Sequence, residues 1–291
     1  MTVREATVED VEDFDKAVKL TYEKQFGPGG ETKRGGKKAE GEPGIHPMLR
    51  KLVKSVGDSN GYPRRKMSIL DGFAPREYVV GCPASLSNLP TGRATRGFVE
   101  MSAETKKLVF LKDTWRADVA SMPEEDHWYR LLKNQRGGSG LKNIGAYMHG
   151  SDVFARKQIV RCPDLKQRTI ANIYSRECGW GVISGYIHHR FIQSELYIPL
   201  QTFRDSEHLT RVIFDIVKGT FLPLPNQFPR WLTSFVALEH VHGVGIFHCD
   251  LSTGNIMIDV RGRGRLIDFD IARLQGSYAP FSGVGSLAYL S

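Results

Sequence analysis

The chain has 291 residues, of which 41% are hydrophobic and 25% are charged, a balance typical of a globular protein with one large domain or two lobes. Its four cysteines are scattered without a C-x-x-C pair, which excludes a disulfide framework or a zinc ribbon. Lysine and arginine outnumber aspartate and glutamate by 40 to 32, and the formal net charge is +8.

Two further features bear on the compartment. The N-terminal residues are polar and soon acidic, unlike a secretory signal peptide. No apolar run is long enough to span a bilayer, so no membrane partner is expected. Together with the cysteine pattern, these features predict an intracellular protein, cytoplasmic or nuclear.

The first predicted element is an amphipathic helix over residues 6–26. Val11, Phe14, Val18 and Tyr22 recur at helical spacing, with acids early in the segment and lysines later, as the helix dipole favours. We interpret this apolar stripe as a packing face. Residues 1–75 as a whole are predicted to form an N-terminal extension.

The rest of this extension is predicted to be a basic linker. Residues 27–45 are rich in Gly, Pro, Lys and Glu, which is typical of disorder, and residues 46–56 are compatible with a short basic helix. Residues 33–66 hold ten Lys and Arg against three acids. A nucleic-acid arm or nuclear-import signal is the alternative, but no aromatic residues interleave the basic ones. Nucleic acid is therefore not an expected partner.

Residues 76–198 are predicted to form a small β-rich lobe. Strands are expected at Glu77–Pro83, Arg96–Met101 and Lys107–Trp115, with further strands between residues 169 and 196. One helix is expected over Pro123–Asn134, because proline suits a first helical turn and acids follow it.

Residues 199–291 are predicted to form a partial helical lobe. Ser206–Lys218 carries apolar residues on one face, and Gly219 is placed to cap its C-terminus. A second helix, Arg230–Val241, leads into a polar loop. A strand-rich lobe with one helix, followed by a helical lobe, predicts a bilobal α+β fold.

The most informative motif is the polar loop His248–Asn255, followed by Leu266–Asp270. The loop reads H-C-D-L-S-T-G-N and the second segment reads L-I-D-F-D. Phosphoryl transfer needs positioning and charge neutralisation, which one Asp near the acceptor hydroxyl and an Asn and Asp around magnesium supply. The alternative interpretation is an ordinary β-hairpin with polar loop residues.

With motif and lobe order together, the chain resembles the fungal-type protein kinases, a branch of the protein-kinase superfamily. The resemblance covers roughly residues 76–291 and rests on segments similar to the family's G-R-x-T-R, K-D-x-W, H-R-D-I-S-x-G-N and L-I-D-F-D: Thr91–Arg96, Lys112–Trp115, His248–Asn255 and Leu266–Asp270. It implies a protein-kinase-like fold and a serine/threonine kinase that uses ATP and magnesium on a protein substrate. The oligomeric state is not indicated.

The resemblance also implies residue roles. Asp250 would be the catalytic base, and Asn255 and Asp268 would hold magnesium. Lys112 would bind the ATP phosphates, with Glu125 as its helix partner and Glu124 as the alternative.

The phosphate-covering loop would be the segment from residue 92 to residue 97. Its pattern is G-x-A-x-x-G, in which Gly92, Ala94 and Gly97 stand where the usual loop has three glycines. Alanine at the middle position restricts the backbone there.

Three departures from the kinase pattern qualify this function. Cys249 replaces the Arg of H-R-D, which makes control through an activation-loop phosphate doubtful. Asp270 replaces the Gly of D-F-G, where its carboxylate could stiffen the segment or join the metal site. Residues 285–291 resemble the end of an activation segment, and no A-P-E motif follows, so the helical lobe is expected to be incomplete.

Two alternative functions stay open at this point. A small-molecule phosphotransferase would share the H-x-D-x-x-x-x-N loop and the second aspartate segment. A catalytically inactive kinase fold acting as a binding module would fit the altered glycine loop and the short C-terminal lobe.

Overall fold

The structure is a computed structural model. It describes residues 3–26, 62–71, 74–86, 93–119, 122–135, 143–154, 166–169, 185–217, 241 and 243–275. The predicted linker, the short basic helix, nearly all of the helix expected over Arg230–Val241, Gly92, Gly219 and the segment from residue 276 onward lie outside these residues. No helix in the described part of the chain is long and apolar enough to cross a membrane.

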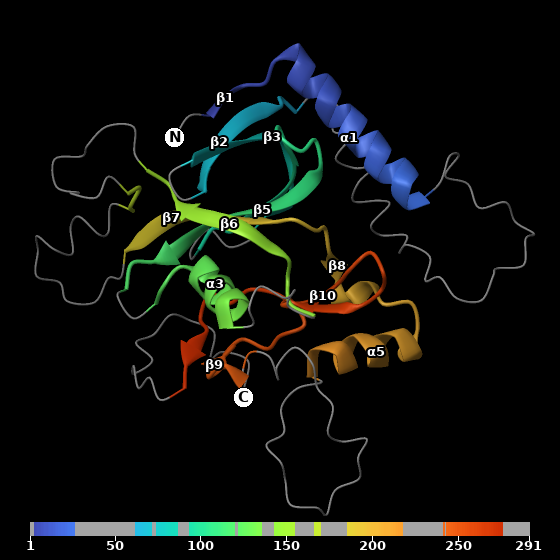
Figure 1. The fold of residues 1–291 in the computed structure, drawn as a ribbon, viewed down its shortest axis with the longest axis vertical. Helices are drawn as coiled ribbons and strands as arrows, with labels where there is room; N and C mark the ends of the chain where they lie inside the picture. Colours follow the sequence, from blue (N-terminus) through green and yellow to red (C-terminus); the bar gives the residue numbers. More distant parts are fainter. Residues whose placement is uncertain are drawn as a thin grey trace, which may run out of the picture.

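A seven-stranded antiparallel sheet dominates the molecule, with the strand order β1-β2-β3-β4-β5-β7-β6 (Figure 1). Its strands are β1 (Val3–Glu5), β2 (Arg65–Asp71), β3 (Ala74–Leu86), β4 (Arg96–Ser102), β5 (Leu108–Ala117), β6 (Tyr147–Asp152) and β7 (Tyr186–Gln193). The sheet curves until β2 also contacts β6, and it encloses an apolar cluster that includes Met67, Tyr78 and Leu111.

Strands β3, β4 and β5 confirm the three strands predicted at these positions, and β3 is longer than expected at both ends. Strand β7 lies in the region where further strands were expected. Strand β6 was not predicted, because its sequence, YMHGSD, is polar and carries little strand signal. It pairs with β7 at the edge of the sheet, so tertiary contacts decide its conformation.

The sheet continues across the boundary expected between residues 75 and 76. Strand β2 pairs with β3 along its whole length, and β1 pairs with β2. In β2, the buried Met67 and Ile69 alternate with more exposed neighbours, a strand pattern hidden within the basic run. The division of the chain into three units stays a prediction, and part of the proposed extension belongs to the sheet.

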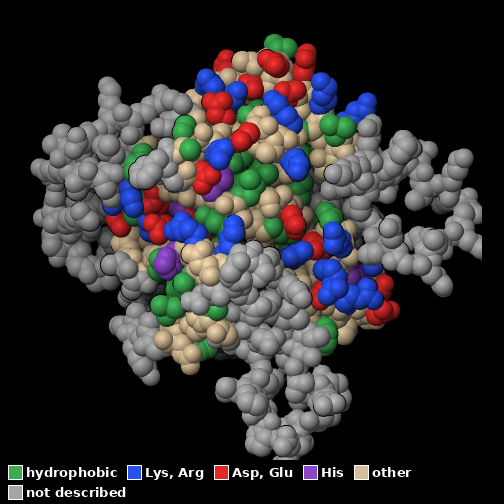
Figure 2. Space-filling view, in the orientation of Figure 1, with side chains coloured by type: hydrophobic (Ala, Val, Ile, Leu, Met, Phe, Trp, Pro, Cys, Tyr) green, Lys and Arg blue, Asp and Glu red, His purple; other side chains and the backbone are tan. Residues whose placement is uncertain are grey.

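Helix α1 (Val8–Phe26) confirms the predicted N-terminal helix and packs on β3 and β5. Phe14 and Val18 of the predicted apolar stripe are buried. The helix begins with a reciprocal cap, in which the Asp10 N–H donates to Thr7 Oγ1 and the Thr7 N–H donates to Asp10 Oδ2. Around α1, Figure 2 shows basic and acidic side chains intermingled, as in the Lys66–Asp10 ion pair.

The described residues from Ile198 onward lie below the sheet in Figure 1. They form α5 (Ser206–Val217), a 3-10 turn η1 (Leu200–Thr202), a three-stranded sheet of β8 (Ile198–Pro199), β10 (Ile256–Ile258) and β11 (Gly264–Leu266), and a pair formed by β9 (Ile246–Phe247) and β12 (Arg273–Leu274). Helix α3 (Glu125–Gln135) stands between this part and the large sheet. One apolar core joins these elements through Phe14 of α1, Tyr129 of α3, Val212 of α5 and Phe269.

Candidate active site

Lys112 and Glu125 form a buried ion pair between the large sheet and α3. Lys112 lies in β5 and Glu125 is the first residue of α3, and Lys112 Nζ is 2.7 Å from Glu125 Oε2. Trp128, Tyr129 and Leu132 are buried on the same helix, so packing fixes the side that Glu125 presents to the sheet. The structure thus brings together the pair that the resemblance implied.

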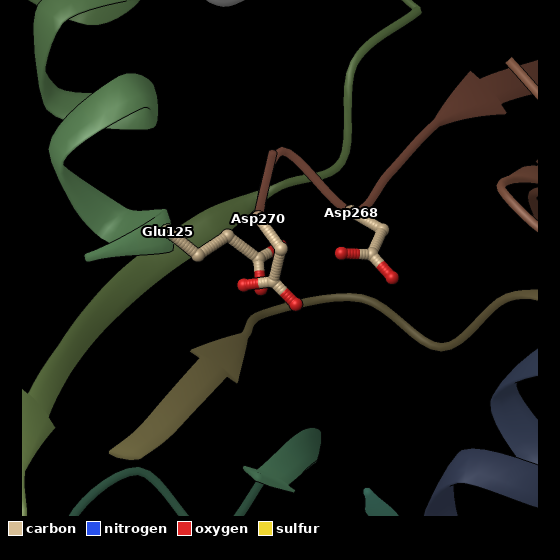
Figure 3. Close-up of side chains that lie close together, drawn as sticks. All are labelled: Glu125, Asp268 and Asp270. Carbon is tan, nitrogen blue, oxygen red and sulfur yellow. The ribbon is translucent and has the colours of Figure 1, made fainter. Parts of the chain in front are cut away.

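Two more carboxylates meet the same lysine. Lys112 Nζ lies 2.9 Å from Asp268 Oδ1 and 2.9 Å from Asp270 Oδ2. Figure 3 shows the three carboxyl groups converging, with Glu125 arriving from α3 and the two aspartates from the segment after β11. Their ligand atoms lie within 4.8 Å of one another. Asp270 therefore belongs to this cluster, and its role at a metal site stays a prediction.

The electrostatics of the cluster keep the lysine charged. Burial opposes the Lys112 cation, but the carboxylates of Asp268, Asp270 and Glu125 raise its pKa well above the ordinary value. Burial also raises the pKa of Glu125 and of Asp268. The pKa of Asp270 is lowered despite its burial, because Lys112 and Arg93 both stabilise its charge. Among the three carboxylates, Glu125 and Asp268 therefore take up a proton more readily than Asp270 does.

Asp250 and Asn255 are held together within the polar loop. Asn255 Nδ2 donates to the Asp250 backbone oxygen at 2.9 Å and to Asp250 Oδ2 at 3.0 Å. The Asn255 backbone oxygen accepts a hydrogen bond of 3.0 Å from the Ile267 N–H, which ties the loop to the strand before Asp268. Asn255 is buried and Asp250 is half-buried, so one carboxylate oxygen is oriented while the group keeps access to solvent.

His248 makes a second connection between the same two segments. Its Nδ1 accepts from the Asp250 N–H at 3.3 Å, so Nε2 carries the proton and donates to the Ile267 oxygen at 2.9 Å. Burial lowers the pKa of His248, which favours this neutral form. The His248 ring also meets the Phe269 ring edge-on at 4.6 Å, and Phe269 meets Tyr129 of α3 at 4.9 Å. Phe269 therefore links the loop to the helix that carries Glu125.

Two positions in these segments have backbone conformations that are uncommon for residues other than glycine. Cys249 has φ of 63° and Asp268 has φ of 65°. Such conformations persist where the surrounding structure determines them, and they concentrate at functional sites. Cys249 is exposed, and burial of part of its side chain raises the pKa of its thiol, which favours the unreactive thiol form.

The predicted phosphate-covering segment is described from residue 93 onward. Ala94 has φ of 42°, the left-handed conformation for which glycine is better suited. Gly97 lies in β4 opposite Lys112. A Cβ atom at Gly97 would stand 2.6 Å from Cζ of Phe110, so side-chain packing already requires glycine there. A nucleotide role for Gly92, Ala94 and Gly97 stays a prediction.

Sequence reasoning missed one residue of the site. Arg93 Nη1 lies 2.5 Å from Asp270 Oδ2, and these two residues are 177 positions apart in the chain. The available signal was the Arg within the G-R-x-T-R run, which served for the resemblance but was not assigned a role. Its contact with Asp270 depends on the tertiary structure.

The donor set fits a magnesium ion. Magnesium prefers hard oxygen ligands such as carboxylate and amide oxygens. Asn255 uses its amide nitrogen for both contacts with Asp250, which leaves the amide oxygen as the atom to offer a metal. The side chain of Asp268 is 28% exposed, so a ligand can reach it.

Comparison with known proteins gives partial matches to kinases. No protein-family model matches the chain. It is 23% identical over 198 residues to mitogen-activated protein kinase kinase kinase ANP1 of Arabidopsis thaliana, covering 62% of this chain and 29% of that protein. It is 36% identical over 112 residues to the serine/threonine-protein kinase SKS1 of Saccharomyces cerevisiae, covering 35% of this chain and 20% of that protein.

The relatives are serine/threonine protein kinases. A bacterial one, the DNA damage-responsive kinase RqkA of Deinococcus radiodurans, is 39% identical over 81 residues, which cover 25% of this chain and 12% of that protein. The chain thus spans less than a third of the length of each of these three relatives. These similarities and the β-rich sheet with few helices confirm the predicted kinase-like α+β fold. The finer assignment to the fungal-type branch stays a prediction.

Proposed function

We propose that the chain is the catalytic part of a serine/threonine protein kinase that transfers the γ-phosphoryl group of Mg-ATP to a protein hydroxyl. The observation that carries the proposal is the position of Lys112, which bridges Glu125 of α3 and Asp268 within hydrogen-bond distance. In protein kinases, a strand lysine paired with a helix glutamate and a metal-binding aspartate must both be in place for transfer. The kinase relatives support the same reading.

Each residue then has a defined task. Asp250 accepts the proton of the acceptor hydroxyl as the new bond from oxygen to the γ-phosphorus forms and the bond to the ADP oxygen breaks. Asn255 orients the Asp250 carboxylate through the 3.0 Å hydrogen bond and offers its own amide oxygen to magnesium. Asp268 is the second metal ligand. When bound, magnesium neutralises charge that develops on the phosphate oxygens.

Lys112 binds the phosphates, and Glu125 positions it. The lysine reaches the nucleotide as a cation because its pKa is raised by the surrounding carboxylates. The backbone of residues 93–97 would cover the phosphates from the side of β4. The substrate is a protein with an exposed serine or threonine.

The test is phosphotransfer from radiolabelled ATP to a set of acidic and basic proteins, with the chain as purified. We expect magnesium-dependent transfer that falls at least about 100-fold in Asp250→Asn and Asp268→Asn. Glu207→Gln is the matched control, because Glu207 is an exposed carboxylate on α5 whose side chain is 82% accessible. Magnesium-dependent ATP binding without transfer would favour a binding module, and transfer to small aminoalcohols or sugars alone would favour a small-molecule enzyme.

A further inference from the structure

Arg93 extends from a fixed backbone position across the site. Its carbonyl oxygen accepts hydrogen bonds from the Trp115 N–H at 2.9 Å and Thr114 Oγ1 at 3.5 Å, both on β5. Thr95 adds a side-chain hydrogen bond of 2.8 Å to Thr114. The main chain around Arg93 is therefore anchored to the sheet, while its guanidinium reaches Asp270 on the other lobe.

The Arg93 guanidinium and the Lys112 ammonium group share one oxygen of Asp270. Asp270 Oδ2 lies 2.5 Å from Arg93 Nη1 and 2.9 Å from Lys112 Nζ. With Glu125 and Asp268 included, the cluster has one more carboxylate than it has cations. The cations and carboxylates thus nearly neutralise one another before any nucleotide enters.

Mg-ATP brings groups that compete for the cations and for the carboxylates of this cluster. Its phosphates attract the two cations, and magnesium attracts the carboxylates. Arg93 is the more accessible cation, with a side chain 28% exposed against 12% for Lys112. Its planar fork of donors suits phosphate oxygens better than a single ammonium does.

We propose that Arg93 is a phosphate-binding latch, paired with Asp270 in the empty site and transferred to the nucleotide phosphates when Mg-ATP binds. The inference rests on the proposed function and adds a regulated contact to the same site. It also accounts for the unusual loop. Ala94 keeps a Cβ where backbone amides would approach phosphate, and the neighbouring arginine reaches the phosphates from a greater distance. The Arg93–Asp270 contact holds the segment before β4 to the segment after β11 until nucleotide replaces it.

The experiment measures dissociation constants by calorimetry for Mg-ATP, metal-free ATP and adenosine. Arg93→Met should weaken Mg-ATP binding by about 10- to 100-fold, the loss expected for one charge-assisted contact, and leave adenosine binding unchanged. The Mg-ATP affinity of Arg93→Lys should fall between that of the unmodified chain and that of Arg93→Met. The matched control is Arg211→Met, because Arg211 is an exposed arginine on α5, outside the segments that form the site.

Asp270→Asn supplies an independent readout. Without magnesium, this variant should bind ATP several-fold more tightly, because Arg93 is released from its carboxylate partner. In the Arg93→Met background the same change should have a smaller effect, and this non-additivity measures the coupling between the two residues. Thermal melts confirm that each variant is folded.

The outcomes separate the two proposals. If the unmodified chain binds no Mg-ATP, both the proposed function and the latch fail. If it binds Mg-ATP and Arg93→Met binds equally well, the function stands and the latch is wrong. If Arg93→Met weakens adenosine as much as Mg-ATP, the residue supports the structure of the site and does not bind phosphate, which also overturns the latch.

Discussion

His189 Nδ1 lies 2.9 Å from Asp152 Oδ1 in a buried hydrogen bond between β7 and β6. The other ring nitrogen of His189 faces Asp126 Oδ1 of α3 at 3.6 Å. Because Asp126 follows Glu125 in the chain, this polar cluster sits next to the residue that pairs with the active-site lysine. The sheet and the first turn of α3 thus meet through polar side chains as well as through the apolar core.

Asp152 is expected to make the fold sensitive to acid. It accepts two hydrogen bonds from Arg116, at 2.9 and 2.7 Å, and contacts Lys166 at 2.8 Å. Although Asp152 is buried, the hydrogen bonds from His189, Arg116 and Lys166 hold its pKa far below the ordinary 3.8. A carboxylate with a depressed folded pKa stabilises above its unfolded pKa, and that contribution is lost as the pH falls below it.

Asp152→Asn should therefore lower the free energy of unfolding at pH 7 by roughly 3–5 kcal/mol, as expected when one partner of a buried pair is removed. Urea unfolding at a series of pH values would show the difference between the two proteins shrinking below pH ~4. The control is Glu207→Gln. A difference that stays constant down to acid pH would contradict the assignment.

Glu100 is expected to oppose stability at neutral and alkaline pH. It is fully buried in β4, and neither carboxyl oxygen has a hydrogen-bond partner. Burial raises its pKa well above the ordinary 4.5, although Arg190 partly offsets this. Between its unfolded pKa and its raised folded pKa, such an acid is neutral in the folded chain and ionised in the unfolded chain. The free energy of unfolding therefore falls as the pH rises above 4.5.

Glu100→Gln should match the unmodified chain near pH 4 and be more stable at pH 8, by roughly 1–3 kcal/mol. The measurement is thermal or urea unfolding at both pH values. Glu100→Met removes the unsatisfied polar group itself, and should stabilise the fold at both pH values. Equal stability of Glu100→Gln and the unmodified chain at pH 8 would show that Glu100 finds a partner or water.

The stability of the polar loop is expected to depend on the neutral form of His248. Its Nδ1 must be unprotonated to accept from Asp250, and burial lowers its pKa below the ordinary 6.5. A histidine with a depressed folded pKa contributes its full stability above the unfolded pKa, and that stability is lost as the pH falls below 6.5.

His248→Phe keeps a ring beside Phe269 but removes the two ring nitrogens that hydrogen-bond to the Asp250 N–H and the Ile267 oxygen. We expect it to lower the free energy of unfolding by roughly 1–3 kcal/mol and to flatten the dependence of stability on pH between pH ~5 and ~7. Denaturant unfolding across that range tests both effects. If the slope with pH is the same in both proteins, another group titrates there.

Gly97 allows packing and nucleotide roles to be separated. A Cβ at this position would collide with Phe110 and with Ser85 Oγ, so Gly97→Ala should destabilise the sheet by roughly 1–3 kcal/mol. Adding Phe110→Leu removes the collision with the ring, and the Ser85 hydroxyl can rotate away from the methyl group about its own Cα–Cβ bond. If packing alone requires glycine, the double variant should regain stability and Mg-ATP affinity together.

The two possible requirements predict different results in the double variant. Recovered stability with Mg-ATP affinity still reduced would mean that the methyl group blocks the approach of phosphate to β4. Phe110→Leu alone is the control for the lost aromatic ring. Unfolding curves and calorimetry on the same samples give both quantities.

Local patterns in the sequence were enough to predict the helices α1, α3 and α5 and the strands β3, β4 and β5. Helices α1 and α5 follow from periodicity, because one face of each is buried and the spacing of apolar residues records it, whereas α3 was expected from the proline and the acids at its start. The Asp250–Asn255 contact spans five residues, so a short loop can bring the two side chains together.

Tertiary structure decided the features that depend on distant segments. Three features join residues whose local sequence does not indicate the contact. They are the Arg93–Asp270 ion pair, the pairing of β1 and β2 with the large sheet, and the inclusion of β6 in that sheet. The burial of Glu100 without a hydrogen-bond partner also depends on the tertiary structure, because the position of Glu100 in β4 shows only which face of the strand it occupies. Periodicity reports how one element is exposed, whereas the partner of a side chain is set by which elements pack against it.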